Sequence, residues 1–477
     1  MDGRLKSAYP TILLVIALIV GSIFTAYLIV TVGAVIAPVV VVAVGGLFLT
    51  GMMFRHYKTG IYAIFMLAVF MSFIGRMTGI EFPFGIVLDA LSVLVFLIML
   101  FSKQETDWSR LKSGITYLYV FVTAYQLLQV FNPNATSYIA WVVGLRIHTS
   151  FLLFIAFYHL FQSPGDAKKF TILWIALGAI VAAYGLYQEF FGLNAREVRW
   201  IYSSPSRPGL YLIWGHMRKF SFLSDPSAYG LFMAFSGLAC FVLMMGPFKP
   251  LQRIMFGGLA LMMWWAMSYS GTRTATAMVA VGLAFYFLIT LKSRKTFIVM
   301  ILTAVAGVGI LYGPFYGGTI NRIRSTFAID KDASMNVRDQ RRISMQQYVK
   351  THPFGGGVNT TGANGARYSP DHPLGGGWDP DSGYLLTALE IGWVGLLLGM
   401  AFFFVVVLKG INNYFSIRDP LVRTLNLTYV VPFLTMTVAH FTQDAMFQKP
   451  QVVVLVATYA LMLQIPSYDK KPNTNFS

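Results

Sequence analysis

Long apolar runs, repeated along the whole chain, are the feature that most restricts its fold. Each run is roughly 17–25 residues long, which is the length of a helix that crosses a bilayer. Hydrophobic residues make up 56% of the 477 residues, whereas charged residues make up only 12%, well below their share in soluble proteins. We therefore expect an all-α, polytopic integral membrane protein.

The runs predict about fourteen transmembrane helices. The first run, residues 11–54, is too long for one span and divides most simply near Gly33. No small-residue cleavage site follows it, so we expect its first span to remain in the mature protein. The other spans are expected near residues 60–75, 85–102, 113–131, 147–162, 170–191, 228–246, 254–270, 274–291, 296–314, 382–408, 425–443 and 450–465.

The basic residues orient these helices. If the N-terminus is cytoplasmic, the inner segments hold 19 of the 36 Lys and Arg residues, as the positive-inside rule requires. The short outer connections hold only Arg76, Arg146, Arg273 and Lys449. Both termini are therefore predicted to be cytoplasmic.

Two long outer segments, residues 193–227 and 316–381, hold the other 13 basic residues, and the second is a large extracytoplasmic loop before the twelfth helix. On the outer side Arg outnumbers Lys 13 to 4, whereas on the inner side Lys outnumbers Arg 12 to 7. Arginine is preferred where a planar fork must hold phosphate or carboxylate. Two interpretations stay open: arginines that only decorate the membrane surface, or an anionic substrate on the outer side.

The same pattern excludes other classes of site. The basic residues that give the net charge of +17 lie between apolar segments and form no continuous patch, so nucleic acid is not an expected partner. The single cysteine, Cys240, excludes a disulfide framework and a cysteine-based metal site. No acidic cluster with metal-ligand spacing is visible, and no cofactor is expected.

Several outer motifs carry candidate chemistry. Arg218 shortly precedes Asp225-Pro226-Ser227, a helix-start signal, and Arg273 lies in a short connection next to the membrane. The large loop carries Arg338 and Arg342. All four arginines are candidates for binding an anion, with a structural or snorkelling role as the alternative.

A second group of motifs surrounds the end of the large loop. His352-Pro353 and His372-Pro373 each begin a turn with three glycines, which is either a paired loop around a ligand or a chance repeat. Asp381 then precedes Tyr384, and Glu390 follows inside the next span, where it either contacts substrate or packs against a buried arginine. Trp214 is one of the loop aromatics that suit stacking on sugar rings, and a cluster of His440, Gln443 and Asp444 is a candidate acceptor groove.

In their order and outer placement, these pieces resemble the O-antigen ligase/polymerase superfamily of bacterial envelope enzymes, over roughly residues 140–465. The resemblance rests on the following pieces: Gly144-Leu145-Arg146, Tyr184-Gly185-Leu186-Tyr187-Gln188, Arg218 with Asp225-Pro226, Ser270 with Arg273, Arg342 with His352-Pro353, and Tyr384-Leu385 with Glu390, Gly392 and Gly395.

The resemblance implies an inverting, metal-independent glycosyltransferase in the bacterial inner membrane, with its active site facing the periplasm or exterior. Its substrate would be an oligosaccharide on undecaprenyl diphosphate, and its acceptor a hydroxyl of a glycan, of lipid A core or of a protein. Arg218 and Arg273 would hold the diphosphate, helped by Arg338 and Arg342. Membrane lipid is an implied partner, and a chain-length regulator is left open.

The chain departs from this family at one position. The ligases usually place a histidine just before the Tyr-Leu motif, where this chain has Asp381-Ser382. The general base is therefore open among Asp381, His372 and His352, with loop-capping and surface roles as alternatives. The departure favours a polymerase or a divergent transferase over a ligase.

The sequence predicts three regions: N-terminal transmembrane helices in residues 1–140, a ligase/polymerase-like core in residues 141–465, and a cytoplasmic tail in residues 466–477. The alternative from another class is a secondary transporter for an anion or other solute. An inverted repeat or a matching pair of broken spans would favour that alternative, and the sequence shows neither.

Overall fold

The computed structural model describes residues 45–46, 49–79, 84–102, 105–213, 215–314, 320–321, 324, 343, 345–376 and 380–469. The chain divides into two units, residues 1–60 and residues 61–477. Residues 49–55 of the first unit are helical. Apart from the first turn of α3, all elements named below belong to the second unit.

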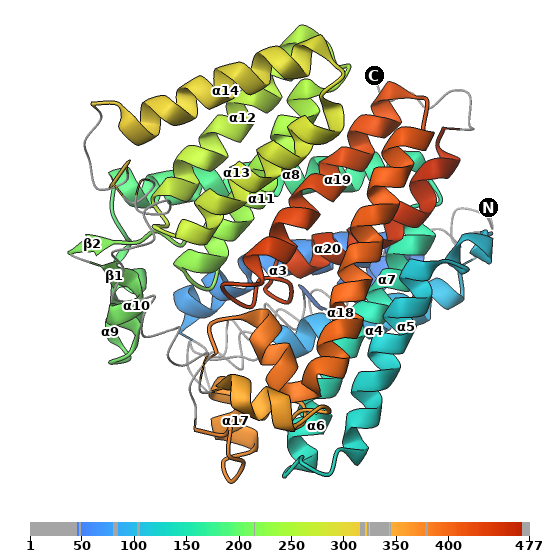
Figure 1. Cartoon of the computed structure of the whole chain (residues 1–477), viewed down its shortest axis with the longest axis vertical. Coiled ribbons are helices and arrows are strands. Elements are labelled where there is room, and N and C mark those ends of the chain that lie inside the picture. Colours follow the sequence, from blue (N-terminus) through green and yellow to red (C-terminus); the bar gives the residue numbers. More distant parts are fainter. Residues whose placement is uncertain are drawn as a thin grey trace, which may run out of the picture. The chain divides into compact units, whose positions relative to one another are not determined.

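Helices provide nearly all the regular structure of the described residues (Figure 1). The exception is a two-stranded antiparallel sheet, in which Leu212 pairs with Met217 and Ile213 with His216. In chain order the elements are α3 (Tyr57–Thr78), α4 (Phe84–Leu100), η2 (Trp108–Leu111), α5 (Gly114–Leu128), η3 (Gln129–Phe131), α6 (Tyr138–Gly144), η4 (Leu145–His148), α7 (Thr149–Leu160), α8 (Pro164–Phe190), α9 (Ala195–Tyr202), α10 (Arg207–Tyr211), β1 (Leu212–Ile213), β2 (His216–Met217), α11 (Pro226–Met245), α12 (Pro250–Ser268), α13 (Arg273–Thr290), α14 (Arg294–Tyr312), α17 (Gly362–Tyr368), α18 (Gly383–Ser416), α19 (Pro420–Ala439), α20 (Gln451–Gln464) and η6 (Ile465–Ser467).

The predicted class, an all-α polytopic membrane protein, is confirmed. Among the described residues, nine helices are long and apolar enough to cross a membrane, and α4 and α20 are shorter apolar helices. Every span predicted after residue 60 coincides with a helix or with consecutive helices, although α12 is not among the nine. The predicted spans before residue 45 lie outside the described residues, so the number fourteen and the orientation stay predictions.

Helix starts follow the local signals in the sequence. The Asp225 carboxylate accepts hydrogen bonds from the backbone N–H groups of Ser227 and Ala228, at 2.8 and 2.9 Å, and Pro226 is the first residue of α11. This cap satisfies amides that have no partner in the first turn of a helix. The predicted helix start at Asp225-Pro226-Ser227 is confirmed.

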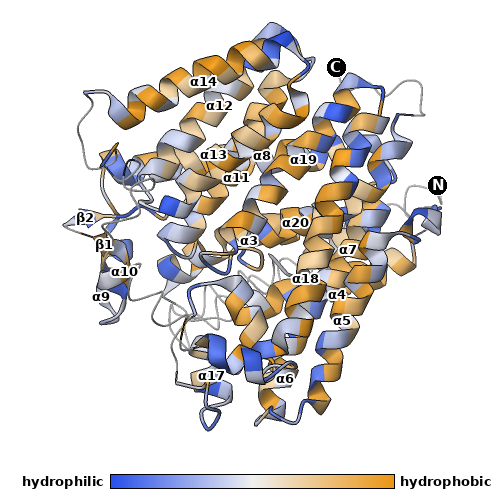
Figure 2. Cartoon of the chain, in the orientation of Figure 1, coloured by the Kyte–Doolittle hydropathy of each residue, from blue (hydrophilic) through white to orange (hydrophobic). Residues whose placement is uncertain are grey.

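Helix α11 lies at the centre of one group of helices, against α12, α13 and α19 (Figure 1). In the 18-residue stretch of α11 that best suits a membrane span, 94% of the residues are buried, whereas in that of α14 only 6% are buried. A second group pairs α18 with α5 and α20 with α7. Figure 2 shows apolar residues along both groups and polar residues gathered on the short α17.

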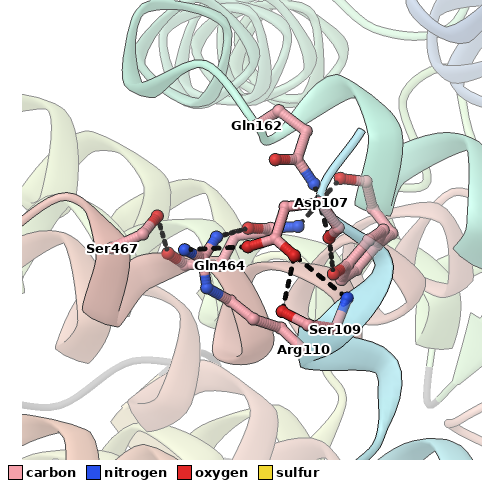
Figure 3. A network of polar contacts seen from close by, with 7 residues as sticks. Asp107, Ser109, Arg110, Gln162, Gln464 and Ser467 are labelled. Atoms are coloured by element: carbon pink, nitrogen blue, oxygen red, sulfur yellow. Dashed lines mark hydrogen bonds and ion pairs between the residues drawn. The ribbon is translucent and has the colours of Figure 1, made fainter. Parts of the chain in front are cut away.

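Polar contacts tie the helix ends together. Figure 3 shows the network at the start of α5: Arg110 pairs with Asp107 at 3.2 Å and donates to Oε1 of Gln464 at the end of α20, at 2.9 Å. The hydroxyl of Tyr158, near the end of α7, donates to the carbonyl of Asp107. These contacts join three segments that the positive-inside rule places on one side of the membrane. Segments predicted for the other side are joined in the same way, since the backbone N–H of Gly383 donates to the carbonyl of His440 at 2.9 Å.

Candidate functional site

A break in α18 organises the site. Gly392 adopts φ 75° and ψ 176°, so the helix is interrupted two turns after its start. This backbone region is accessible only to glycine at low cost. An interruption also frees backbone carbonyl groups, which need new partners at membrane depth.

The glycine loop that begins at His352-Pro353 supplies these partners. The backbone N–H groups of Gly356 and Gly357 donate to the carbonyls of Leu389 and Glu390, both at 2.8 Å. The hydroxyl of Tyr125 on α5 donates to the carbonyl of Ile391 at 2.8 Å. The break in α18 and the glycine loop therefore form one structural unit.

Only glycine fits at the contact between the two backbones. A Cβ on Gly392 would overlap the carbonyl of Pro353, and a Cβ on Gly355 would lie 2.5 Å from the carbonyl oxygen of Glu390. The side-chain amides of Asn132 and Asn134 also donate to the carbonyl of Gly355, at 3.2 and 3.0 Å. The loop is thus held from two sides.

The second His-Pro turn packs against the first. The ring of His372 lies so close to Gly356 that a Cβ there would be 2.6 Å from it. Its Nδ1 accepts the N–H of Leu374 at 3.0 Å, and its Nε2 lies 3.5 Å from the hydroxyl of Tyr348. Burial lowers the pKa of His372, so the ring is neutral at pH 7. The two His-Pro turns thus pack against each other, and the interpretation that they surround a ligand stays a prediction.

His352 also belongs to this packed unit. Its ring stacks on Tyr348 with centroids 3.9 Å apart, and its Nδ1 lies 3.0 Å from the carbonyl of Tyr348. The two histidines thus lie on either side of one tyrosine, and each has at least one ring nitrogen engaged by the protein.

A cavity of about 660 Å³ lies beside this unit. It is bordered by α5, the α6–α7 segment, α17, α18 and α20, and by the segment between α19 and α20. Its polar side chains come mainly from the α6–α7 segment, from α17 with the residues before it and from the start of α18, and we call them the polar part. The apolar part consists of side chains from the middle of α18 and from α20. The polar set includes Arg146, His148, Asn359, Thr361, Asn364, Arg367, Tyr384, Glu390 and His440, and the apolar set includes Leu396, Met400, Phe402, Phe403, Val452 and Val456.

Glu390 is held in the polar part of the cavity by Thr361. Its Oε1 accepts a hydrogen bond from the Thr361 hydroxyl at 2.8 Å and lies 3.4 Å from the Thr361 backbone nitrogen. Glu390 is a lining residue of the cavity, and its contact with a substrate stays a prediction.

Arg146 brings positive charge to the same cavity. It pairs with Asp89 of α4 at 2.6 Å, and Asp89 also accepts from the hydroxyl of Thr149 at 3.1 Å. Lys449 lies nearby, because a Cβ on Gly85 would be 2.5 Å from Arg146 Nη2 and 3.4 Å from Lys449 Nζ. A second cation thus lies near this ion pair, and burial lowers the pKa of Lys449.

His440 and Tyr384 form the wall of the cavity at the start of α18. His440 follows the last residue of α19 and is 1% exposed. The ring of Tyr384 meets it edge-on, with centroids 4.7 Å apart, and the Tyr384 hydroxyl donates to the carbonyl of Thr437 at 2.8 Å.

Arg218 lies in a different place, between two loops. It is 6% exposed, and its guanidinium donates to the carbonyl of Ser270 at 2.7 Å, to the carbonyl of Leu210 at 3.1 Å and to the hydroxyl of Thr272 at 3.1 Å. These bonds fix the turn that precedes Arg273, the first residue of α13. In the next position of α13, the Thr274 hydroxyl lies 2.8 Å from that of Thr442.

The structure therefore separates the predicted site residues. Tyr384 and Glu390 line the cavity, whereas Arg218, Arg273 and Asp381 are not among its lining residues. Asp381 immediately precedes the Ser382 cap of α18 and has φ 50°. Trp214, Arg338 and Arg342 lie outside the described residues.

The sequence did not single out two arginines of the cavity. Arg146 appeared only within a motif of the resemblance, and its position in a short outer connection was the available signal. Arg367 carried no signal beyond the excess of arginine in the outer loops. Within the described part of the chain, no three His, Cys, Asp or Glu side chains lie together as metal ligands would.

Comparison with known families matches residues 258–400 to the O-antigen ligase family model. This segment is therefore similar to an O-antigen ligase domain. It extends from α12 through the break in α18 and contains Arg273, the paired His-Pro turns, Tyr384 and Glu390. The resemblance to the O-antigen ligase/polymerase superfamily is therefore confirmed, and it supports a function of the lipid-linked glycan ligase or polymerase kind. No curated protein matches the chain.

The matched segment supplies only part of the candidate site. Arg146 and His440 lie outside residues 258–400, on either side of the domain in sequence, and reach the cavity through the fold. Arg218 also lies outside the matched residues.

Proposed function

We propose that the chain transfers a glycan from undecaprenyl diphosphate to a hydroxyl acceptor on the outer face of the bacterial inner membrane. The observation that carries the proposal is the placement of the O-antigen ligase domain. Its broken helix α18 presents Tyr384 and Glu390 to a cavity of about 660 Å³ at the end of the helix. A binding site next to lipid suits a substrate with a lipid anchor and a polar glycan.

The lining of the cavity supports a glycan ligand. Asn359, Asn364 and Gln126 offer amide groups to sugar hydroxyls, and Trp141 and Tyr368 offer aromatic rings for stacking. The apolar part lies beside the middle of α18, where a lipid chain is a compatible neighbour. We assign the glycan end of the substrates to the polar part.

We place the diphosphate near the start of α13. Arg273 is the first residue of this helix, so its charge adds to the positive end of the helix dipole. Arg218 shapes the preceding turn through its hydrogen bonds and adds a second positive charge. Arg338 and Arg342, which lie outside the described residues, are further candidates for binding the diphosphate, as the resemblance implies.

These groups support an inverting transfer that needs no metal ion. The acceptor oxygen attacks the anomeric carbon of the glycan as its bond to the diphosphate breaks. Arginine charge stabilises the negative charge that accumulates on the leaving diphosphate. A general base takes the proton of the acceptor hydroxyl.

The diphosphate site is tested by Arg273→Ala, with Arg218→Ala as a second variant. Arg199→Ala is a matched control, because Arg199 is an exposed outer-loop arginine on α9. We expect Arg273→Ala to lower glycan transfer at least 100-fold and Arg199→Ala to leave it within about twofold, since each charged hydrogen bond at a reacting centre contributes several kcal/mol. All variants should reach the membrane in normal amount, as measured by immunoblotting. Near-normal glycan output from Arg273→Ala would refute the role in diphosphate binding.

The acceptor is identified by product analysis. Purified protein is given an undecaprenyl-diphosphate oligosaccharide alone. A ladder of longer products identifies a polymerase, and products that form only after another acceptor is added identify a ligase. The aspartate at position 381, where the ligases usually have histidine, favours the polymerase outcome.

A further inference from the structure

Five basic residues gather where α11 turns into α12 and α13 turns into α14. We call them the basic cluster, and they are Lys249, Arg253, Lys292, Arg294 and Lys295. Lys295 joins the two turns, because its ammonium group donates to the carbonyl of Met245, the last residue of α11, at 2.9 Å. Both turns therefore lie on the same side of the membrane.

The basic cluster has no carboxylate to offset its charge. The chain has no Asp or Glu between residues 226 and 329, the stretch that contains both turns. Within the described part of the chain, none of the ion pairs involves a member of the cluster. Arg253 and Lys295 lie close enough for their positive charges to repel each other. Like charges held together in this way favour the binding of an anion.

Two other basic segments predicted for the same side do contain acids. Arg110 pairs with Asp107 at 3.2 Å, and Lys169 pairs with Asp166 at 3.6 Å. The positive-inside rule explains why basic residues lie on this side, and it applies to all three segments. It does not account for the lack of carboxylates in the basic cluster.

The basic cluster also has hydrogen-bond donors left for a ligand. An ammonium group has three donors, and that of Lys295 directs two of them to carbonyls at the end of α11. Nε of Arg253 is buried, and it has no partner in the part of the chain that the structure describes. A buried donor without an acceptor is unfavourable, so a ligand that accepts from it gains affinity. The other three members of the cluster are exposed beside these two: Lys249, Lys292 and Arg294.

Exposed apolar side chains continue from the basic cluster along two helices. They include Leu251 and Ile254 on α12, and Phe297, Ile298 and Leu302 on α14, all more than half exposed. Figure 2 shows α14 as apolar along most of its length, with polar residues at its start. An anionic headgroup with acyl chains matches this arrangement, whereas free phosphate or an acidic protein would leave the apolar faces uncovered.

We propose that the basic cluster binds the headgroup of an anionic phospholipid, such as phosphatidylglycerol, whose acyl chains lie along α12 and α14. The lipid phosphate accepts hydrogen bonds from Arg253 and Lys295, and the other three members add positive charge. The predicted orientation places the cluster at the cytoplasmic leaflet, where anionic lipids supply this headgroup. The inference is independent of the proposed function, because the cluster lies at the opposite end of α13 from Arg273.

Native mass spectrometry of the detergent-purified full chain measures the affinity for the first phosphatidylglycerol molecule, with phosphatidylcholine as the zwitterionic control lipid. The test variant combines Arg253→Gln with Lys292→Gln, since neither side chain is hydrogen-bonded within the described part of the chain. Lys295 is left in place because it holds the end of α11. We expect the affinity for phosphatidylglycerol to fall about 25-fold, because each Lys or Arg beside an anionic surface contributes about a factor of five.

The matched control combines Lys168→Gln with Lys169→Gln. It removes two charges from a basic segment that contains an acid, Asp166, and should keep the affinity within about twofold. Thermal unfolding in detergent checks that both double variants are folded. If Arg253 proves necessary for folding, Lys292→Gln with Arg294→Gln gives the same comparison at two exposed positions.

Three results would overturn the inference. An equal loss of affinity in the test and control variants would mean that binding follows net charge alone. Equal affinity for phosphatidylglycerol and phosphatidylcholine would exclude recognition of the anionic headgroup. Displacement of phosphatidylglycerol by millimolar inorganic phosphate would indicate a site for the free anion in place of a lipid site.

Discussion

The break in α18 makes a strong prediction for Gly392→Ala. Gly392 has φ 75° and ψ 176°, a conformation that costs a residue with a Cβ about 1–3 kcal/mol. The new methyl group would also overlap the carbonyl of Pro353, which is backbone and cannot rotate away. The glycine loop must therefore move from the helix or α18 must close its break.

Either response breaks the hydrogen bonds between the loop and the helix. The bonds from Gly356 and Gly357 to the carbonyls of Leu389 and Glu390 contribute about 0.5–1.5 kcal/mol each. Together with the backbone strain, we expect Gly392→Ala to lower the free energy of unfolding by about 2–6 kcal/mol. Glycan transfer should fall at the same time, since Glu390 and Thr361 lie on the two sides of the disrupted contact.

The matched control is Gly258→Ala. Gly258 lies within α12, and a Cβ there would meet no atom within 4 Å. Alanine is favoured over glycine inside a helix by about 1 kcal/mol, so this variant should be as stable as the unmodified protein or slightly more stable. Thermal unfolding of the detergent-purified proteins, followed by tryptophan fluorescence, makes the comparison. Equal unfolding temperatures and equal glycan transfer for Gly392→Ala and Gly258→Ala would refute the reasoning.

The remaining predictions concern metal ions and pH. Glycan transfer should continue in excess EDTA, because arginines supply the positive charge at the proposed diphosphate site; a strict requirement for added Mg²⁺ or Mn²⁺ would contradict this. Burial lowers the pKa of His372, so its contribution to stability is complete above the ordinary histidine pKa of about 6.5 and is lost as the pH falls below that value. Thermal unfolding at pH 7.5 and pH 5 should therefore show a smaller acid destabilisation in His372→Gln than in the unmodified protein, and equal destabilisation would contradict the assignment.

The helices were predictable because their signal is local. The length of an apolar run predicts the length of the helix. The Asp225-Pro226 pair predicts where α11 begins, because Asp225 caps the helix through amides no more than three residues away. The break at Gly392 was not predictable in this way. Glycine is tolerated inside membrane helices, and the feature that distinguishes Gly392 is its contact with Pro353, which is distant in sequence.

In the candidate site, too, residues in a local motif were predictable, whereas contacts between helices were not. Tyr384 and Glu390 were found because they lie on one helix beside a recognisable motif, and both line the cavity. His440 was noticed only as part of a polar cluster, since its contact with Gly383 depends on how α19 packs against α18. A sequence motif identifies residues that lie on one segment, such as Tyr384 and Glu390. The residue that packs against them from another segment, here His440, is identified only by the fold.

The excess of arginine in the predicted outer segments has a second explanation in the structure. The guanidinium of Arg76 donates to the carbonyls of Ser221 and Leu223, and that of Arg218 donates to two carbonyls and a hydroxyl. A lysine has no fork that could satisfy several fixed carbonyl groups at once. Part of the excess thus serves loop architecture, and an arginine count alone does not locate an anion site. Other outer arginines that donate to backbone carbonyls are Arg196, Arg207 and Arg324.

Three outer arginines are distinguished by their position. Arg146 and Arg367 line the cavity, and Arg273 begins α13 next to the segment that carries His440. Arg146 pairs with Asp89, and Lys449 adds a further positive charge nearby. A substrate with a diphosphate and a glycan presents two polar regions. Positive charge lies at the two places where we propose that these regions bind, since Arg146 and Arg367 line the cavity and Arg273 begins α13.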